Sequence, residues 1–186
     1  AEDAAYDIAL ESEGTTGTSD KWSATTMSDL HKGFEKVVHH RLITSARVYN
    51  FPMHILKLAL DMYTAPRRIR CGAAVCKPVW TTMGVLAGCP IAMGALCLAV
   101  LNPMDKFMSE VPQSLADVKV YVDDFTISHV VDGSFTPYEA ANKLQQIVRR
   151  LHELLDTVDL KCSRDKNVFM TNSKTYATIV EFVLEE

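Results

Sequence analysis

The sequence lacks several features that would place it in a particular class of protein. Its five cysteines include no CxxC pair, which argues against a zinc site or a disulfide framework and for reduced thiols. No basic region is followed by an apolar stretch and a small-residue cleavage site, so nothing in the sequence directs secretion. Internal repeats and low-complexity tracts are absent as well. We therefore expect an intracellular protein of the nucleus or cytoplasm, not a secreted one.

A net excess of positive charge is also missing. The formal net charge is −4, whereas a protein that binds nucleic acid usually presents a basic surface to the phosphates. Local clusters of basic residues partly offset this, either as contacts to a nucleic-acid backbone or as ordinary solvated surface. The clusters are Arg67, Arg68 and Arg70, then Arg149 and Arg150, and then Lys161, Arg164 and Lys166.

An uninterrupted hydrophobic run long enough for a membrane span is not present. Residues 85–101 are all apolar, glycine or proline, but Gly88 and Pro90 interrupt them. The remaining stretch, residues 91–101, covers only about half of the ~20 residues that a bilayer requires. We expect a buried helix that starts at Pro90 and ends at Asn102, before Pro103, and no membrane partner.

Length and composition predict one globular domain with a substantial core, since 48% of the 186 residues are hydrophobic and 23% are charged. The chain does not begin with methionine, so we expect a processed piece or an excised segment of a longer polyprotein. The predicted elements of the first half are a helix (4–13), a loop (14–21), a strand (22–28), a helix (52–63) and an accessory hairpin (67–71 and 75–82) around Gly72. The helix that begins at Pro52 is expected to bury Ile55, Leu58, Ala59 and Met62.

The second half centres on a hairpin and a long helix. Residues 118–122 and 125–130 alternate in polarity as two strands of a tight hairpin with Asp123 and Asp124 at its tip. Thr136 and Glu139 form a capping box for a helix with one apolar stripe. The remaining predicted elements are this helix (137–157) and three strands (160–162, 168–170 and 176–184).

The adjacent carboxylates at the hairpin tip require an explanation. Aspartate tolerates the unusual dihedral angles of a tight turn, so a turn alone could explain one of them. It explains two less well, because neighbouring carboxylates repel unless a positive charge lies beside them. A hard divalent cation is the natural candidate, since Mg²⁺ is typically bound by one or two carboxylates together with substrate phosphates and water.

Element order brings a third carboxylate to the same place. The predicted elements follow one another as strand, helices, strand, strand, helix and strand. This order is that of the split βαβ arrangement, an α+β fold with helices packed on one face of an antiparallel sheet. The third strand lies between the first two, so Asp29 at the end of the first strand should lie beside Asp123 and Asp124. Two ions about 3.5–4 Å apart would then support an in-line displacement at a phosphate, which is nucleotidyl transfer.

Four motifs resemble those of reverse transcriptases and follow one another along the chain in the order typical of that family. YVDD (121–124) resembles the catalytic motif, and SDLHKGFEKVVHHRLI (28–43) is similar to the preceding aspartate motif of the group II intron and non-long-terminal-repeat retrotransposon branch. GVLAGCPIA (84–92) resembles the nucleotide-binding loop, and LKCSRDKN (160–167) resembles the later lysine motif. The resemblance implies a polymerase palm over residues 22–186, with partial fingers around 64–83, no thumb, and an N-terminal helix and loop over 1–21.

The resemblance also implies roles for particular residues. Asp29, Asp123, Asp124 and the Leu30 carbonyl would bind two Mg²⁺ ions, for which Mn²⁺ could substitute, and Lys166 would assist the departing pyrophosphate unless it is a plain surface lysine. Phe34 would lie against the sugar and exclude a 2′-hydroxyl, or else be a core side chain that steadies the turn. The implied nucleotide-binding set is Leu30, His31, Lys32, Gly33, Phe34, Ala87, Gly88 and Tyr121. The partners would be an RNA or DNA template with its primer, and deoxynucleoside triphosphates.

Some positions depart from the family pattern. Ala87 stands where the family usually has glutamine, and Glu35 replaces the usual aspartate. Without a basic fingers segment and a thumb, we expect the chain alone to polymerise weakly or not at all. His31, His39 and His40 have no second ligand pair at metal spacing and are expected on a helix surface.

Three functions follow from this pattern. The first is the palm of an RNA-directed DNA polymerase. The second is a palm-like domain that has lost catalysis and serves nucleic-acid binding or assembly, which the net charge and Ala87 favour and the intact aspartates oppose. The third, a metal-dependent phosphohydrolase, would need water-activating residues that the sequence does not reveal.

Overall fold

The computed structural model describes residues 21–163 and 166–185. The predicted helix 4–13 and all of the loop 14–21 except Lys21 lie outside these residues. In chain order, the elements are β1 (Lys21–Asp29), α2 (Gly33–Lys36), α3 (His39–Val48), α4 (Met53–Thr64), β2 (Arg70–Cys71), β3 (Ala74–Val75), α5 (Ala92–Glu110), β4 (Ala116–Tyr121), β5 (Asp124–Asp132), α6 (Pro137–Asp156), β6 (Val168–Thr171) and α7 (Lys174–Glu185).

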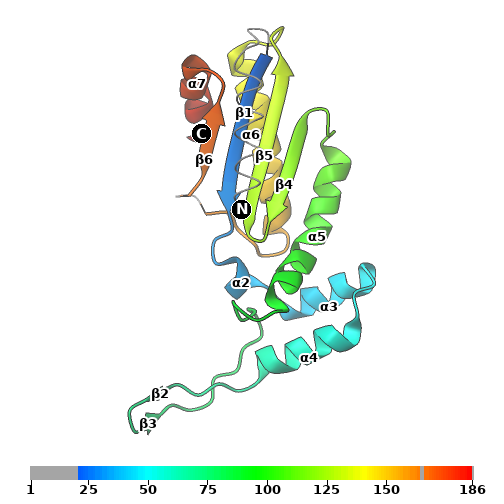
Figure 1. Cartoon of the computed structure of the whole chain (residues 1–186), viewed down its shortest axis with the longest axis vertical. Coiled ribbons are helices and arrows are strands. Elements are labelled where there is room, and N and C mark those ends of the chain that lie inside the picture. The colour runs from blue at the N-terminus through cyan, green and yellow to red at the C-terminus, as the bar shows by residue number, and fades with distance from the viewer. Residues whose placement is uncertain (1–20, 164–165, 186) are drawn as a thin grey trace.

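A four-stranded sheet forms the centre of the fold (Figure 1). Its order is β4-β5-β1-β6, and all neighbouring strands are antiparallel. Because β5 lies between β1 and β4, these two strands run parallel to each other, as the split βαβ arrangement requires. The predicted α+β fold is confirmed. The end of β1 and the turn between β4 and β5 therefore share one edge of the sheet.

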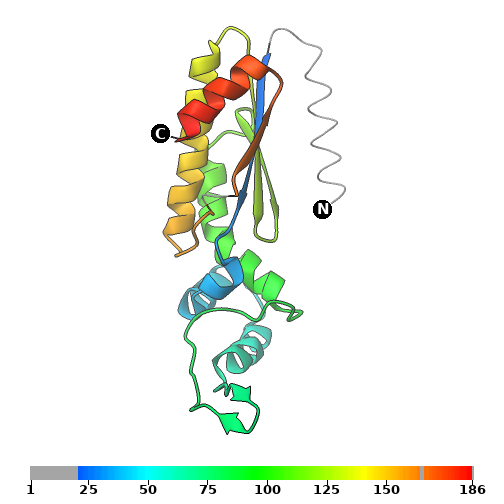
Figure 2. The same ribbon diagram turned by 90° about the vertical axis from the view of Figure 1, so that its left-hand side faces the viewer.

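Helices α5, α6 and α7 cover one face of the sheet (Figure 2). Alternation along β1 places Ala24, Thr26 and Ser28 in the interior, and β5 buries Phe125 and Ile127 in the same way. This confirms the expected packing of the helices against a single face. The alternate residues of the strands lie on the opposite face.

Helix α6 begins and packs as its sequence predicts. The Thr136 hydroxyl accepts from the Glu139 amide at 3.3 Å, and the Thr136 amide donates to the Glu139 carboxylate at 2.8 Å, which completes the capping box. Leu144, Leu151 and Leu155 are fully buried along its inner stripe. Burial of each such side chain contributes roughly 1.5–3 kcal/mol to folding, so this stripe is the main attachment of the helix.

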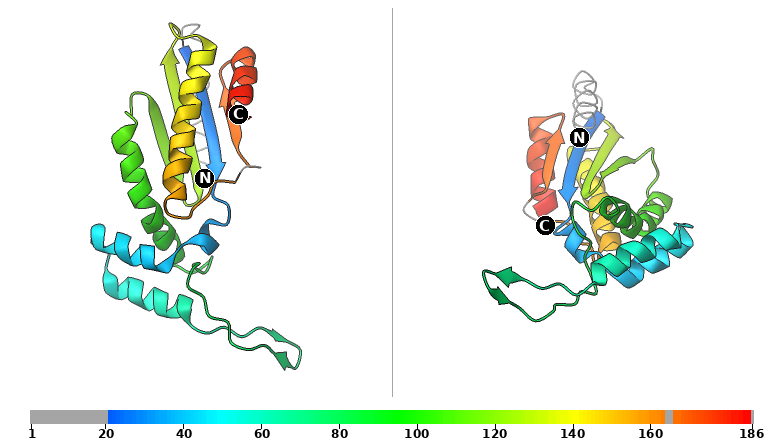
Figure 3. Two further views of the ribbon diagram at one scale, coloured as in Figure 1. Left: turned by 180° about the vertical axis from the view of Figure 1, so that it is seen from behind. Right: turned by 60° about the horizontal axis from the view of Figure 1, so that its bottom comes forward.

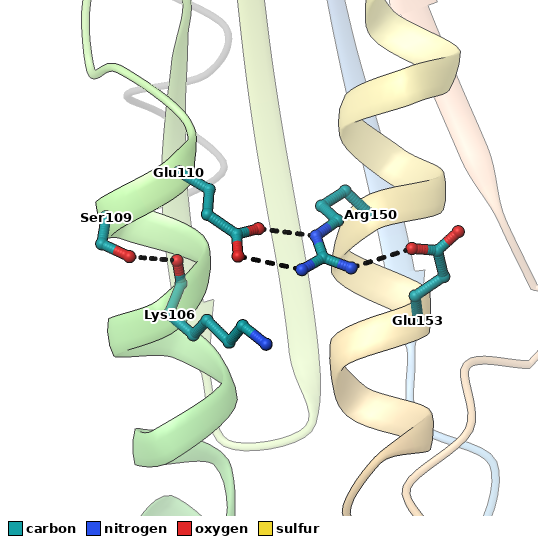
Figure 4. Close-up of polar contacts among 5 residues, drawn as sticks. All are labelled: Lys106, Ser109, Glu110, Arg150 and Glu153. Atoms are coloured by element: carbon teal, nitrogen blue, oxygen red, sulfur yellow. Dashed lines mark hydrogen bonds and ion pairs between the residues drawn. The ribbon is translucent and has the colours of Figure 1, made fainter.

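An ion pair joins α5 to α6 on their outer side (Figure 4). The Arg150 guanidinium donates from Nε and Nη2 to the two carboxylate oxygens of Glu110, at 2.6 and 2.9 Å, and from Nη1 to Glu153 at 3.0 Å. The hydrogen bond from Arg150 lowers the pKa of Glu110 below its ordinary value. This fork-to-carboxylate geometry is the strong form of a surface ion pair.

Helix α5 differs from its prediction at its end. The helix continues through Asn102 and Pro103 to Glu110. Proline removes one backbone donor and disfavours a continuous helix, but Pro103 and Phe107 are both buried, so packing maintains the helix. In the part of the chain that the structure describes, no helix combines the length and the apolar character of a membrane span.

The predicted strand 176–184 is wrong, because this segment forms α7. Its buried residues are Tyr176, Val180 and Val183, a helical spacing of four and three. The β-branched residues of the segment favour a strand locally, but packing against α6 and β6 selects the helix.

Helices α2, α3 and α4 lie beyond the end of the sheet (Figures 1 and 3). In α4, Ala59 is buried as predicted, together with Leu56 and Tyr63. The other three predicted residues are exposed: Ile55 at 37%, Leu58 at 61% and Met62 at 45%. The predicted face is therefore shifted, because α3 packs on a neighbouring strip of α4.

The accessory hairpin is shorter than predicted. Its strands are β2 and β3, two residues each, with a further isolated bridge between Arg67 and Val79. The predicted strand 160–162 is likewise reduced to one bridge between Leu30 and Cys162. The predicted strand 168–170 is confirmed as β6, one residue longer.

Candidate metal centre

A two-residue turn joins β4 to β5, one residue earlier than the predicted tip, because Asp124 is already the first residue of β5. Tyr121 pairs with Asp124 across the turn, which leaves Val122 and Asp123 as its central residues. Val122 has φ +61°, a conformation that β-branched residues adopt only under strain. The unusual dihedral angle thus falls on the valine and not on either aspartate. Turn geometry therefore does not account for the two carboxylates, and the metal interpretation gains support.

Asp29 lies beside this turn, as the topology predicts. It is the last residue of β1 and pairs with Asp124 on β5. The next amide, that of Leu30, donates to the Asp123 carbonyl at 3.0 Å and ties the two segments together. One carboxylate oxygen from each of Asp29, Asp123 and Asp124 lies within 4.8 Å of the others.

The three carboxylates fit a hard divalent cation. They offer only oxygen atoms, and Mg²⁺ binds oxygen at about 2.1 Å, so one ion spans oxygens up to roughly 4 Å apart. Asp29 and Asp123 are half-buried and Asp124 is exposed, so water or phosphate oxygens can reach the remaining ligand positions. Small rotamer changes would bring all three carboxylates onto one or two ions.

The electrostatics of the site agree with this fit. Partial burial raises the pKa of Asp124 above its ordinary value, and the negative charges of Asp123 and Asp29 raise it further. The positive charge of Lys166 acts in the opposite direction. A raised pKa means that the ionised form of the carboxyl group is disfavoured, and a cation that binds beside it stabilises that form.

Lys166 is the positively charged neighbour. Its ammonium forms an ion pair with Asp29, which raises the pKa of the lysine. The segment before it is fixed to the end of β1 by two backbone hydrogen bonds of 2.7 Å, from Ser163 to the Asp29 carbonyl and from His31 to the Lys161 carbonyl. Burial raises the pKa of the Cys162 thiol to about 12, so this cysteine is an inert neighbour of the site.

Gly33 packs directly behind the acidic corner. An added Cβ would lie 3.1 Å from the Leu30 Cβ and 3.6 Å from the Asp123 Cβ, so the position has little space for a side chain. Lys32, just before it, has φ +55°. His31 and Lys32 are exposed, and Phe34 is half-buried against the core.

The glycine-containing loop (84–88) lies against the segment after Asp29. The Val85 amide donates to the Phe34 carbonyl at 2.8 Å, and the Gly84 amide donates to the Val37 carbonyl at 2.7 Å. Gly84 and Gly88 both have φ +86°, where glycine is favoured. An open pocket of about 290 Å³ borders the loop. Its lining residues are Glu35, Arg67, Met83, Gly84, Val85, Leu86 and Ala87.

Two features of this region were not predicted from the sequence. His39 is buried, and its Nε2 lies 2.7 Å from the Gly84 carbonyl, so its expected surface position is wrong and it anchors the loop. Arg67 lines the pocket. The role of His39 is seen only in its contact with Gly84, which lies 45 positions further along the chain. Tyr121 is 55% exposed and pairs with Asp124 across the turn.

Comparison with known proteins adds evidence on the fold. No protein-family model matches the sequence, and no curated protein matches it either. Among solved structures, 43 chains match. One is an apo telomerase from Candida tropicalis, truncated from the C-terminal domain, with a TM-score of 0.60 and 12% sequence identity. The shared fold is an α+β fold with a four-stranded antiparallel sheet and packed helices, which is consistent with a reverse-transcriptase palm.

The match covers 92% of the present chain but only 35% of the telomerase chain. This chain thus spans about a third of the length of that relative. At this identity the comparison concerns the fold alone. The acidic corner lies within a palm-like sheet, and the chemistry of the site has to be argued from its own residues.

Proposed function

We propose that this chain is the palm of an RNA-directed DNA polymerase of the group II intron and non-long-terminal-repeat branch, which adds deoxynucleotides to a primer 3′-hydroxyl. The observation that supports this most is the convergence of Asp29, Asp123 and Asp124 within 4.8 Å at one edge of a palm-like sheet. The branch rests on the motif that follows Asp29 and on the glycine loop. The substrates would be a primed RNA or DNA template and deoxynucleoside triphosphates.

The aspartates would hold two Mg²⁺ ions, or Mn²⁺ in their place, and the Leu30 carbonyl would add a ligand. Once bound, such ions polarise the attacking hydroxyl and offset the charge on the α-phosphate and the leaving pyrophosphate. Lys166 would leave Asp29 and place its ammonium, a proton donor, near the pyrophosphate oxygens. The exposed position of Lys166 is consistent with this change of partner.

The remaining residues would position the nucleotide. The close packing behind Gly33 supports a role in bringing the chain near the sugar, with Phe34 beside it. Gly88 and Ala87 would let the loop backbone approach the base pair. Ala87 offers no side-chain amide there, so we expect slower incorporation than a glutamine at this position would allow.

A cation titration tests the site. Mn²⁺ binding is measured by electron paramagnetic resonance. We expect the wild-type chain to bind Mn²⁺ and Asp123→Asn to bind it much more weakly. Asp61→Asn, which removes an exposed carboxylate from α4, is the matched control and should bind Mn²⁺ like the wild type. Equal binding by all three proteins would reject the metal centre.

A primer-extension assay then separates the two candidate functions. Incorporation that depends on Asp123 supports the polymerase. The alternative, a palm-like domain that has lost catalysis and serves nucleic-acid binding or assembly, is favoured by the net charge of −4 and by Ala87. It predicts no incorporation under any metal condition, even when a primed template binds.

A further inference from the structure

A basic arm, defined here as residues 66–80, extends from the body of the protein (Figures 1 and 3). Its two sides are joined by β2 and β3, by the backbone bond from Cys76 to Ile69 at 3.0 Å, and by the reciprocal bonds of Arg67 and Val79 at 3.0 and 2.8 Å. Every residue from 64 to 80 is exposed. The side chains of the arm therefore add nothing to the core, and stability does not explain their identity.

The charge of the arm is opposite to that of the whole chain. Between Asp61 and Asp105 the sequence contains four basic residues and no acidic one, in a chain of net charge −4. Within the described residues, none forms an ion pair with these four side chains. The four are Arg67, Arg68, Arg70 and Lys77. Such an uncompensated positive surface attracts polyanions.

The strand geometry gathers three of these cations. Arg68 and Arg70 are two positions apart in an extended chain, so they share one side of the hairpin. The register that pairs Arg70 with Val75 and Ile69 with Cys76 brings Lys77 across from Arg68. Arg70 is steadied by a 2.9 Å bond from Nε to the Gly72 carbonyl, and its terminal nitrogens remain available.

An exposed tryptophan completes the surface. Trp80 is 70% exposed. Trp22, by contrast, is half-buried and donates from Nε1 to the Phe135 carbonyl at 2.7 Å. A large aromatic ring exposed to water on the same arm as these cations has the composition of a stacking platform for unpaired bases. Bases inside a duplex cannot use such a ring, because they are already stacked.

We propose that the basic arm binds single-stranded nucleic acid, with Arg68, Arg70 and Lys77 on the phosphates and Trp80 stacked on a base. This goes beyond the proposed catalysis, because none of the proposed metal ligands lies in the arm. The arm leads directly into the glycine loop, and Arg67 at its base lines the pocket beside that loop. A strand held by the arm would thus be directed toward the loop and the acidic corner.

The test measures binding of a fluorescent dT20 or U20 oligonucleotide by anisotropy over a salt series, in EDTA so that metal chemistry is excluded. In the variant with Arg68, Arg70 and Lys77 all changed to Gln, the slope of log K against log salt should become shallower by about two, since each single-strand phosphate contact contributes about 0.7. A control with Arg47, Lys106 and Arg149 changed to Gln removes the same charge from α3, α5 and α6 and should keep the wild-type slope.

Trp80 provides a second, independent measurement. Trp80→Ala should weaken oligonucleotide binding about tenfold or more at constant salt. In a Trp22→Phe background Trp80 is the single tryptophan, and its fluorescence should be quenched by the oligonucleotide. Circular dichroism verifies folding, which the variants should retain because every changed side chain of the arm is exposed.

Three results would overturn the proposal: an unchanged slope in the arm variant, an equal loss in the control variant, or binding to anionic lipid vesicles in place of the oligonucleotide. Asp123→Asn should bind the oligonucleotide like the wild type in EDTA. The two proposals can therefore fail separately. Oligonucleotide binding can prove independent of the arm while Mn²⁺ binding depends on Asp123, or Mn²⁺ binding can prove independent of Asp123 while oligonucleotide binding depends on the arm.

Discussion

The Lys166 ammonium lies 2.5 Å from Oδ2 of Asp29, although the two residues are 137 positions apart in the chain. The lysine thus occupies the position in which a cation would contact Asp29. The two positive charges compete for one carboxylate. The site is consequently partly neutralised before any metal arrives, which makes Lys166 a residue whose removal is informative.

Lys166→Met is expected to bind Mn²⁺ roughly two- to fivefold more tightly than the wild type, because an exposed ion pair that opposes binding is lost. Under the proposed function, the same variant should incorporate nucleotides about a hundredfold more slowly, because its proton donor is missing. Lys161→Met, which removes an exposed lysine from the same segment, is the control. A wild-type Mn²⁺ affinity in Lys166→Met would contradict the competition.

Alanine substitutions at two glycines distinguish the effect of backbone strain on stability from the effect of helix propensity. Gly88→Ala should lower the free energy of unfolding by about 1–2 kcal/mol, since its φ of +86° is unfavourable for an L-residue even though the surrounding space is open. Gly94→Ala should raise the free energy of unfolding by about 0.5–1 kcal/mol, since this helical position in α5 has neither a close neighbour nor a positive φ. Urea denaturation measures both, and equal signs would contradict the loop geometry.

Two leucines of α4 test which face of that helix is buried. Leu56→Ala should lower the free energy of unfolding by about 2–5 kcal/mol, because Leu56 is 1% exposed in the core. Leu58→Ala should change it by less than about 0.5 kcal/mol, because Leu58 is 61% exposed. Chemical denaturation of the pair decides between this structure and the face that the sequence pattern predicts, for which Leu58 would be the costly position.

The ion pair between α5 and α6 gives a pH dependence (Figure 4). The pKa of Glu110 is lower in the folded chain than its ordinary value of 4.5. The stabilisation is therefore complete above about pH 4.5 and is lost as the pH falls through the lowered folded value. Arg150→Met should reduce the melting temperature by roughly 2 °C at pH 7, and the difference should shrink as the pH falls below 4.5.

Arg149→Met is the matched control for this prediction, because Arg149 is exposed on the same helix. Its melting temperature should follow that of the wild type across the pH range. High salt should also reduce the effect of Arg150→Met, since the pair lies at the surface. A difference that does not shrink as the pH falls below 4.5 would indicate lost packing of the arginine stem and not a lost ion pair.

The sequence alone was sufficient to predict the elements whose residue pattern is strong and consistent. The capping box at Thr136 and the stripe of α6 follow local rules that tertiary contacts reinforce. The alternating strands and their order placed Asp29 beside Asp123 and Asp124, because the pairing of the strands leaves only one edge for all three. These predictions succeeded because local preference and long-range packing agree at these positions.

Where local preference and packing disagree, only the tertiary structure decided. It made a helix of the β-rich segment α7, carried α5 past Pro103, and shifted the buried face of α4. It also buried His39 under the glycine loop, placed the strained dihedral angle on Val122, and left the basic arm fully exposed. Each of these depends on which surface a segment meets. A neighbouring element supplies that surface, and the segment's own residues do not specify it.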